Sequence, residues 1–313
     1  MAPFDRFEIS REKAEEILSE GFGKKVKVKT LERMSGGMIC SVFHARLDFE
    51  PADVILKIKS GDGESEDFEH QFRVLDFLKK NTEFPVPKPY FFCAEKSKAR
   101  VSALVLEFLP GVNLGECSLT PAQRKEIEEQ IAFSVVDLHK HRRETFGSIF
   151  EEGSKSWVDV FRKKIEDTLP VCRQRLEKNT FAGVEEILDN LKRFFEGRDV
   201  VASLVHGDIW ATNVIVDVKD GKAFLSGFVD PSAIYADPEY ELAYLEVFRT
   251  IGEEFFRTYG RFHRIEPVYE LRRTLYYLHT MLVHVQVFGD ASYIRRTESL
   301  ANSLLFHLRG GTG

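Results

Sequence analysis

The stretch Leu204-Val205-His206-Gly207-Asp208-Ile209-Trp210-Ala211-Thr212-Asn213 and the later Gly227-Phe228-Val229-Asp230 combine two aspartates with an asparagine. Asn213 follows Asp208 by five residues, which puts both side chains on one tight loop. Asp230 follows a predicted hairpin that can return it to the same cleft. Magnesium prefers carboxylate and amide oxygens, and phosphoryl transfer from ATP also needs a carboxylate near the acceptor hydroxyl. Each residue alone fits a turn, but the three together predict a site for that reaction.

The segments around this stretch indicate how the chain is organised. Upstream, VKVKTLERM, CSVFHARL, ADVILKIK and ALVLEF alternate or cluster apolar residues as strands do, with one amphipathic helix inserted among them. Downstream, helical patterns dominate, among them Val158–Leu176 and Tyr240–Tyr259. We therefore expect an α+β, two-lobed fold. We expect residues 1–109 to form a small, nucleotide-binding N-lobe with an antiparallel sheet and one main helix. Residues 110–313 are expected to form a larger, mainly helical C-lobe that carries the catalytic loop, the metal site and substrate binding.

Composition narrows the class of protein. The net charge is −6 and no basic face is evident, which argues against a nucleic-acid partner. The four cysteines form no CxxC pair, so a zinc site is not expected. No secretory signal and no apolar run long enough for a membrane span is visible. We therefore expect a cytoplasmic protein without a membrane partner, acting on a small molecule as a monomer or homodimer.

The quoted motifs resemble those of the aminoglycoside phosphotransferase and choline kinase superfamily, whose fold is protein-kinase-like. In protein kinases the corresponding segments are HRDxxxxN and DFG. The resemblance implies that ATP and Mg2+ are the cofactors. It also implies that Asp208 is the catalytic base and that Asn213 and Asp230 are magnesium ligands.

Upstream residues match the same pattern in chain order. Lys57 lies in the strand VILK, at the position where kinases place the lysine that holds the α- and β-phosphates. Alternatively, Lys57 is an ordinary strand lysine whose aliphatic chain is buried and whose ammonium group reaches solvent. Lys59, two residues further on, points to the same side of the strand. The preceding turn contains Ser35, Gly36 and Gly37. Such a turn suits a phosphate loop, although two glycines between strands also fit an ordinary hairpin.

Two further nucleotide positions are less defined by the sequence. Kinases pair the strand lysine with a glutamate of the following helix, but the matching position here holds Gln71, with Glu69 two residues earlier. Either Glu69 takes the role through a shifted helix, or a neutral amide holds the lysine. Glu107 and Leu109 lie where the hinge would meet the adenine, although a strand that ends in Pro-Gly is also an ordinary stop.

Within the superfamily, the chain looks most like the fructosamine (ketosamine) kinase branch. His206-Gly207-Asp208-Ile209-Trp210 resembles its HGDLW, and the later FVDPSAIY, EYELA and HVQVFG stretches resemble its motifs. A TPQ-N-W core is not visible, and Met38 stands where the branch places a cysteine, with Cys40 two residues on. A strand position favours an inert Cys40 over a redox-active one.

The branch implies phosphorylation of a ketoamine sugar at carbon 3, which makes the adduct unstable. Trp210, Tyr235 and His284 are the candidate contacts to that sugar. For Trp210 the alternative is core packing beneath the loop, and for His284 it is a satisfied interior histidine.

Two rival functions stay open. An aminoglycoside or other small-alcohol phosphotransferase shares the same motifs, but residues 261–313 hold seven arginines against four acids, which does not suit a polycationic substrate. A catalytically silent kinase-fold binding or regulatory protein is the second rival. The intact set of Asp208, Asn213 and Asp230 argues against it.

Overall fold

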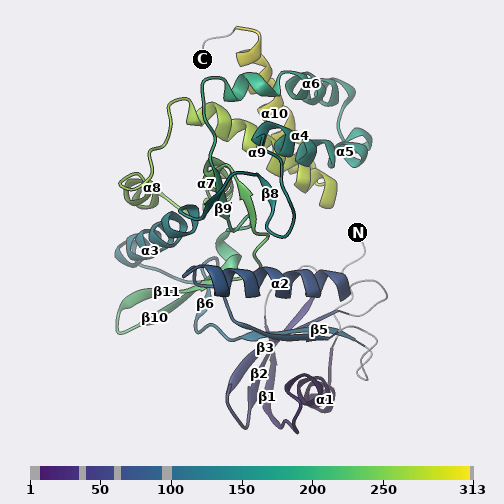
Figure 1. Ribbon diagram of the computed structural model, residues 1–313, viewed down its shortest axis with the longest axis vertical. Helices are drawn as coiled ribbons and strands as arrows, with labels where there is room; N and C mark the ends of the chain where they lie inside the picture. Colours follow the sequence, from purple (N-terminus) through teal and green to yellow (C-terminus); the bar gives the residue numbers. More distant parts are fainter. Residues whose placement is uncertain (1–7, 35–39, 60–64, 94–100, 311–313) are drawn as a thin grey trace. The chain divides into compact units, whose positions relative to one another are not determined.

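The computed structural model describes residues 8–34, 40–59, 65–93 and 101–310. The chain forms two structural units, each made from separate stretches of sequence (Figure 1). The first unit comprises Met1–Gln130 and Ala211–Ser232, and the second comprises Ile131–Trp210 and Ala233–Gly313. The assignment of nucleotide binding to residues 1–109 and of catalysis to residues 110–313 remains a prediction.

The first unit is built on a five-stranded antiparallel sheet in the order β1-β2-β3-β5-β4. The strands are β1 (Val28–Arg33), β2 (Ser41–Leu47), β3 (Asp53–Lys59), β4 (Pro89–Cys93) and β5 (Ser102–Glu107). β3 is the central strand, and Lys57 lies between Val42 of β2 and Leu104 of β5. Helix α2 (Ser65–Asn81) packs against β4 and β5 (Figure 1). Its apolar stripe, which includes Phe68, is buried on the sheet.

Helix α1 (Arg11–Phe22) packs against β1 and β4. Ser10 caps it by accepting a hydrogen bond of 3.2 Å from the backbone N–H of Lys13. Its buried residues, Ala14, Ile17 and Leu18, follow helical spacing and join the apolar core of the sheet. The helix is therefore an integral part of this unit.

A second, three-stranded sheet completes the first unit, in the order β11-β10-β6. It comprises β6 (Val112–Asn113), β10 (Val214–Lys219) and β11 (Lys222–Phe228). Asp220 and Gly221 connect β10 to β11, both with positive φ (52° and 76°), as a two-residue hairpin turn requires. The hairpin begins directly after the 3-10 turn η2 (Ala211–Asn213).

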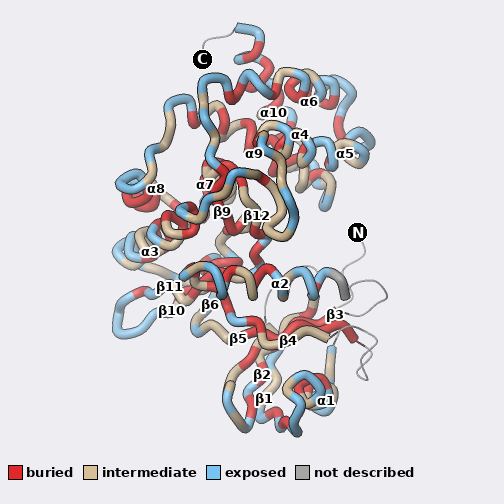
Figure 2. Tube along the Cα trace, viewed as in Figure 1, coloured by how far each residue is buried: buried red, intermediate tan, exposed pale blue. Residues whose placement is uncertain are grey.

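The second unit is mainly helical and contains a small sheet in the order β7-β9-β12-β8. Its strands are β7 (Arg142–Arg143), β8 (Gly147–Ser148), β9 (Ala202–Val205) and β12 (Ile234–Ala236). The chain enters the unit along α3 (Pro121–His139), and the other helices are α4 (Trp157–Glu166), α5 (Leu169–Arg175), α6 (Lys178–Asp189), η1 (Leu191–Phe195), α7 (Pro238–Val247), α8 (Glu253–Tyr259), α9 (Tyr269–Val287) and α10 (Ala291–Leu308). Much of α7 and α9 is buried (Figure 2).

The α+β fold class predicted from the sequence is confirmed, with an antiparallel sheet in the N-terminal part and a helical C-terminal region. Two predicted helices are each divided. The segment Val158–Leu176 forms α4 and α5, because the chain restarts at Thr168 and Pro170 occupies the first turn of α5. The segment Tyr240–Tyr259 forms α7 and α8, because Arg249 takes a positive φ of 54° between them.

Candidate functional site

In the first unit, Lys57 is the centre of the candidate nucleotide-binding residues. Its Nζ donates hydrogen bonds to Oε1 of Gln71 on α2 (2.9 Å) and to Oδ1 of Asp230 (2.6 Å). Only 5% of the residue is exposed. Burial alone would lower the pKa of Lys57, but the Asp230 carboxylate outweighs it and raises the pKa above its ordinary value. Lys57 is therefore a charged, fixed donor beside a predicted metal ligand.

The hairpin of β10 and β11 brings the two predicted metal ligands of this unit together. Val214 faces Phe228 in the ladder, and the N–H of Val229 donates a 2.9 Å hydrogen bond to the carbonyl of Asn213. Asn213 and Asp230 thus stand at the two ends of one hairpin. Asp230 itself takes a positive φ of 57°, a conformation that aspartate tolerates better than most residues.

Gly227 explains how the second end of the hairpin is positioned. Its φ is 151°, and a Cβ there would stand 2.5 Å from the carbonyl oxygen of Pro85 and 3.0 Å from Cδ1 of Leu109. The following N–H, of Phe228, donates a 2.7 Å hydrogen bond to that same Pro85 carbonyl. Only glycine permits so close an approach of the two backbones.

The donor set suits magnesium. Asn213 and Asp230 offer amide and carboxylate oxygens, which Mg2+ prefers, and Mg2+ at phosphate sites needs only one or two protein carboxylates. Within the described ranges there is no group of three or more His, Cys, Asp and Glu that could hold a metal ion. The chemistry of these residues therefore fits a metal held jointly with a bound phosphate group.

The other predicted nucleotide residues have different positions. Glu69 is exposed on α2, and Lys57 contacts Gln71 instead, so the neutral amide stands in the position expected of a glutamate. Glu107 accepts a hydrogen bond of 2.9 Å from the N–H of Lys88, and Leu109 approaches Gly227 as described above. Ser35, Gly36 and Gly37 lie outside the described residues. Burial raises the pKa of the Cys40 thiol, which disfavours the reactive thiolate.

In the second unit, the loop after β9 carries Asp208. His206 is fully buried, and its Nδ1 accepts a hydrogen bond of 3.2 Å from the backbone N–H of Asp208. Gly207 has a positive φ of 84°, and its N–H donates a 2.7 Å hydrogen bond to Oε1 of Glu241 on α7. The backbone N–H groups of Gly207 and Asp208 are therefore both hydrogen-bonded, which fixes the loop at this point.

Glu241 is a buried carboxylate, with 1% of the residue exposed. Burial would raise its pKa, but hydrogen bonds from His139 and the Gly207 N–H, together with the nearby His206, hold the pKa below its ordinary value. Oε2 of Glu241 lies 3.1 Å from Nε2 of His139, whose Nδ1 lies 2.9 Å from the hydroxyl of Tyr259. Glu241 is thus ionised and fully engaged beneath the loop.

Tyr244, one turn further along α7, contacts the predicted base directly. Its hydroxyl donates a hydrogen bond to Oδ1 of Asp208. Burial and the Asp208 carboxylate raise the pKa of Tyr244 well above its ordinary value, so the phenol remains a donor. The sequence motif EYELA pointed to this helix but not to Tyr244, because the contact joins residues 36 positions apart.

Aromatic side chains continue from Tyr244. Its ring meets that of Phe248 edge-on at 5.2 Å, and Phe248 also contacts the rings of Trp210 (6.2 Å) and His284 (5.2 Å). His284 in turn contacts Tyr293 at 4.8 Å. Two predicted sugar contacts, Trp210 and His284, therefore belong to one aromatic group with Phe248 at its centre.

His284 is also bonded within its own helix. Its Nδ1 donates a 2.8 Å hydrogen bond to the carbonyl of Thr280, and burial lowers its pKa. The third predicted sugar contact, Tyr235, has separate surroundings. The Arg143 guanidinium lies over its ring at 4.2 Å, and its backbone pairs with Leu204 of β9.

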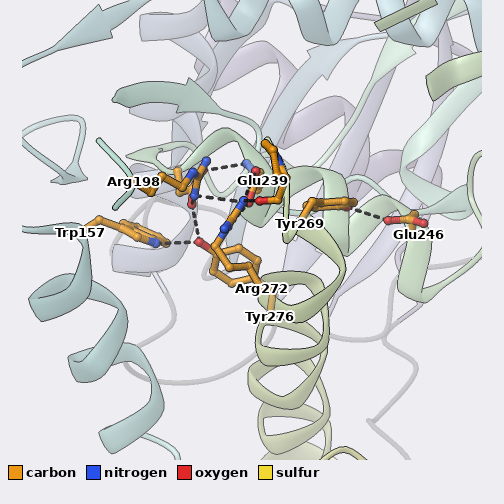
Figure 3. A network of polar contacts seen from close by, with 9 residues as sticks. Trp157, Arg198, Glu239, Glu246, Tyr269, Arg272 and Tyr276 are labelled. Carbon is orange, nitrogen blue, oxygen red and sulfur yellow. Dashed lines mark hydrogen bonds and ion pairs between the residues drawn. The ribbon is translucent and has the colours of Figure 1, made fainter. Parts of the chain in front are cut away.

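A buried polar network fixes the start of α7. Asp237 caps the helix and accepts hydrogen bonds from Arg198 and from the hydroxyl of Tyr276. Glu239 lies between two arginines: Arg272 donates to it at 2.6 and 2.9 Å, and Arg198 approaches at 3.3 Å (Figure 3). Because α7 carries Glu241 and Tyr244, this network holds the helix that supports the Asp208 loop.

Comparison with solved structures defines the class first. The crystal structure of a protein assigned as fructosamine-3-kinase from Haemophilus somnus superposes with a TM-score of 0.73 at 21% identity, covering 94% of this chain and 97% of that one. Aminoglycoside phosphotransferase APH(4)-Ia, as a thermostable mutant, gives 0.61 at 21% identity, covering 95% and 100%. The fold is thus that of the kinase-like small-molecule phosphotransferases.

Sequence comparison then gives the family. The model of the family described as fructosamine kinase matches residues 10–307, so the chain belongs to the fructosamine kinase family, phosphotransferases with an alcohol group as acceptor. A protein-ribulosamine 3-kinase, chloroplastic, of Oryza sativa subsp. indica is 26% identical over 279 residues, 88% of this chain and 78% of that protein. A probable ketoamine kinase of Synechocystis sp. is 30% identical over 135 residues, which span 43% of this chain and 44% of that relative.

Proposed function

We propose that this protein transfers the γ-phosphate of ATP, bound with Mg2+, to a hydroxyl of a ketoamine sugar. The observation that carries the proposal is the 2.6 Å contact between Lys57 Nζ and Asp230 Oδ1, which joins the predicted phosphate-binding lysine to the predicted metal ligand across 173 residues of sequence. Family membership supports the reaction class. The names of the relatives, ketoamine kinase and ribulosamine 3-kinase, support the acceptor.

The first unit supplies the nucleotide end of the proposal. Lys57, charged and nearly inaccessible, holds the α- and β-phosphates, and Asn213 and Asp230 hold the metal. Bound Mg2+ neutralises charge on the phosphates during transfer. The protein's own contribution is to fix these donors before the nucleotide arrives, which the hairpin and the Gln71 contact both favour.

The second unit supplies the acceptor end. Asp208 accepts the proton of the attacking hydroxyl, with its loop held by Glu241 and its carboxylate held by Tyr244. The aromatic group of Trp210, Phe248 and His284 offers flat apolar surfaces, which suit the C–H face of a sugar. We infer that the sugar lies against Trp210, since that residue is the large side chain nearest to Asp208 in sequence.

The test is phosphoryl transfer from labelled ATP to fructose-lysine, ribulose-lysine, choline and an aminoglycoside in parallel, with and without Mg2+. We expect transfer to the ketoamines, with loss of transfer when Mg2+ is chelated. Trp210→Ala should raise KM for the sugar by roughly five- to a hundredfold, by analogy with base stacking, and leave KM for ATP unchanged. A core role for Trp210 predicts instead a lower melting temperature with both constants disturbed.

An aminoglycoside acceptor is the second candidate, favoured only by the shared fold. Transfer to the aminoglycoside and not to a ketoamine would replace the proposed acceptor but keep the reaction class.

The expectation of a cytoplasmic location rests on the four free cysteines, although the rice relative is named as chloroplastic. In the described part of the chain, no helix is long and apolar enough to cross a membrane.

A further inference from the structure

Strand β3 presents two buried lysines to helix α2. Lys57 and Lys59 point to the same side of the strand, with 5% and 6% of each residue exposed. Lys57 contacts Oε1 of Gln71 at 2.9 Å, and Lys59 contacts Oδ2 of Asp67 at 2.5 Å. Asp67 and Gln71 are four residues apart and therefore neighbours on one helix face. The strand and the helix are thus joined by two parallel contacts.

The two contacts are also joined to each other. Asp67 lies one helical turn before Gln71. Burial would raise the pKa of Asp67, but Lys59 and the side chain of Gln71 together hold it below its ordinary value. An amide has one oxygen that accepts and one NH2 group that donates. The ammonium of Lys57 only donates and the carboxylate of Asp67 only accepts. These two charged neighbours therefore fix which way the Gln71 amide faces.

This arrangement differs from a lysine–glutamate pair in where the charge lies. The carboxylate of α2, that of Asp67, pairs with Lys59, which is the next residue on the same face of β3. The contact of Lys57 on α2 is the neutral amide of Gln71. In the described part of α2, no carboxylate pairs with Lys57, so its positive charge is available to Asp230 and to the phosphates of a bound nucleotide. Without the carboxylate of Asp67, the amide could turn its NH2 group toward the ammonium, and Lys57 would lose its acceptor on α2.

We propose that Asp67 is a positioning residue for nucleotide binding, acting through the Gln71 amide on Lys57. This inference rests on the proposed role of Lys57 in binding the phosphates. Lys59, itself buried, is the counter-ion that holds the more exposed Asp67 in place. Lys57 and Lys59 of β3 therefore act together with Asp67 and Gln71 of α2. Asp67 is the only carboxylate among these four residues.

The experiment uses the full chain and titrates Mg·ADP by calorimetry, without acceptor. Asp67→Ala should weaken Mg·ADP binding about fivefold, the value of one hydrogen bond, and raise KM for ATP but not for the sugar. The matched control is Asp76→Ala, on the same helix, where Asp76 is bonded to Lys80 at 2.7 Å; this variant should leave both unchanged.

A double variant separates positioning from folding. Asp67→Ala leaves Lys59 buried without a counter-ion, so this variant should also melt at a lower temperature. Adding Lys59→Met removes that charge and should restore the melting temperature while Mg·ADP affinity stays low, because the amide is still not fixed. If affinity recovers together with stability, Asp67 is merely structural and the inference is overturned. If the unaltered protein itself does not bind Mg·ADP, the proposed function is what fails.

Discussion

The backbone N–H of Gly207 donates a 2.7 Å hydrogen bond to the buried carboxylate of Glu241, so helix α7 holds the loop that carries Asp208. The same helix places the Tyr244 hydroxyl on Asp208 itself. Two contacts from one helix, one to the backbone and one to the side chain, therefore fix both the position and the orientation of the proposed base. α7 is in turn anchored by the contacts of Asp237 and Glu239 with Arg198 and Arg272, so the position of the base also depends on this buried network.

Glu241→Gln should lower kcat by about tenfold or more, because the amide binds the Gly207 N–H and His139 less strongly than a carboxylate does. KM for ATP should stay close to its original value. The matched control is Glu246→Gln on the same helix, which weakens the bonds to Tyr269 and Arg273. Both variants should lose melting temperature, but only Glu241→Gln should lose kcat. An equal loss of kcat in the two would show that α7 has no special hold on the loop.

Asp208→Asn should reduce kcat by about 10² or more, since positioned proton transfer contributes roughly 10²–10⁴ to rate. The change is isosteric and leaves the charge of the first unit untouched, so Mg·ADP should bind as before. Steady-state kinetics with a verified ketoamine and calorimetry with Mg·ADP check the two parts. Near-full turnover in this variant would mean that another group takes the proton.

Asp230→Ala should weaken binding of the metal–nucleotide complex and not only turnover. The substitution removes a carboxylate oxygen from the predicted metal site and leaves Lys57 with Gln71 as its partner. We expect the Mg2+ concentration for half-maximal activity to rise at least tenfold. Titration of Mg2+ at fixed ATP measures it, and an unchanged Mg2+ requirement would remove Asp230 from the metal site.

Tyr244→Phe keeps the ring against Phe248 and deletes only the hydroxyl that donates to Asp208. We expect kcat to fall about ten- to a hundredfold, the value of one hydrogen bond to a charged group, with KM for ATP unchanged. Tyr277→Phe removes a partly buried phenol of α9 in the same unit and serves as the control. If Tyr244→Phe turns over faster, the phenol restrains the base and does not position it.

His279 gives the second unit a pH-dependent stability. Burial lowers the pKa of His279 to about 3, from an ordinary value of 6.5. Below pH 6.5 the unfolded chain binds a proton that the folded chain does not, so this group costs stability as the pH falls from 6.5 toward 3. His279→Leu should therefore lose less melting temperature between pH 7 and pH 5 than the unaltered protein does. The exposed His307→Leu should show the same pH dependence as the unaltered protein.

The fold was predictable from sequence where local signals agree. Ser10 before α1, the capping pair of Thr120 and Gln123 at α3, and the Asp220-Gly221 turn all mark real element ends. The long helical patterns did not show their breaks, because the apolar periodicity runs on past Pro170 and Arg249. α4 has ended at Glu166 before Pro170 opens α5, and the positive φ of Arg249 follows the end of α7. Backbone restrictions, and not the hydrophobic pattern, set these breaks.

The residues of the candidate site likewise differ in how far the sequence alone identifies them. Asp208, Asn213 and Asp230 could be selected because residue types suited to one chemistry stand in chain order at short spacing. Gln71 could be named only as one of two possibilities, since a shift of the helix would have brought Glu69 to the lysine. Tyr244 and Asp67 could not be found at all. Their importance lies in contacts formed across the folded unit, and their residue types alone are common on helices.

The first unit takes up residues Ala211–Ser232 only after the chain has passed through Ile131–Trp210 of the second. A fragment ending at residue 130 would lack β10 and β11, leave β6 without its ladder partner at Ile215, and contain neither Asn213 nor Asp230. An expression clone of the N-terminal portion is consequently a poor tool for screening inhibitors that compete with nucleotide. Recombination that swaps N-terminal portions between relatives would likewise separate Lys57 from its own Asp230.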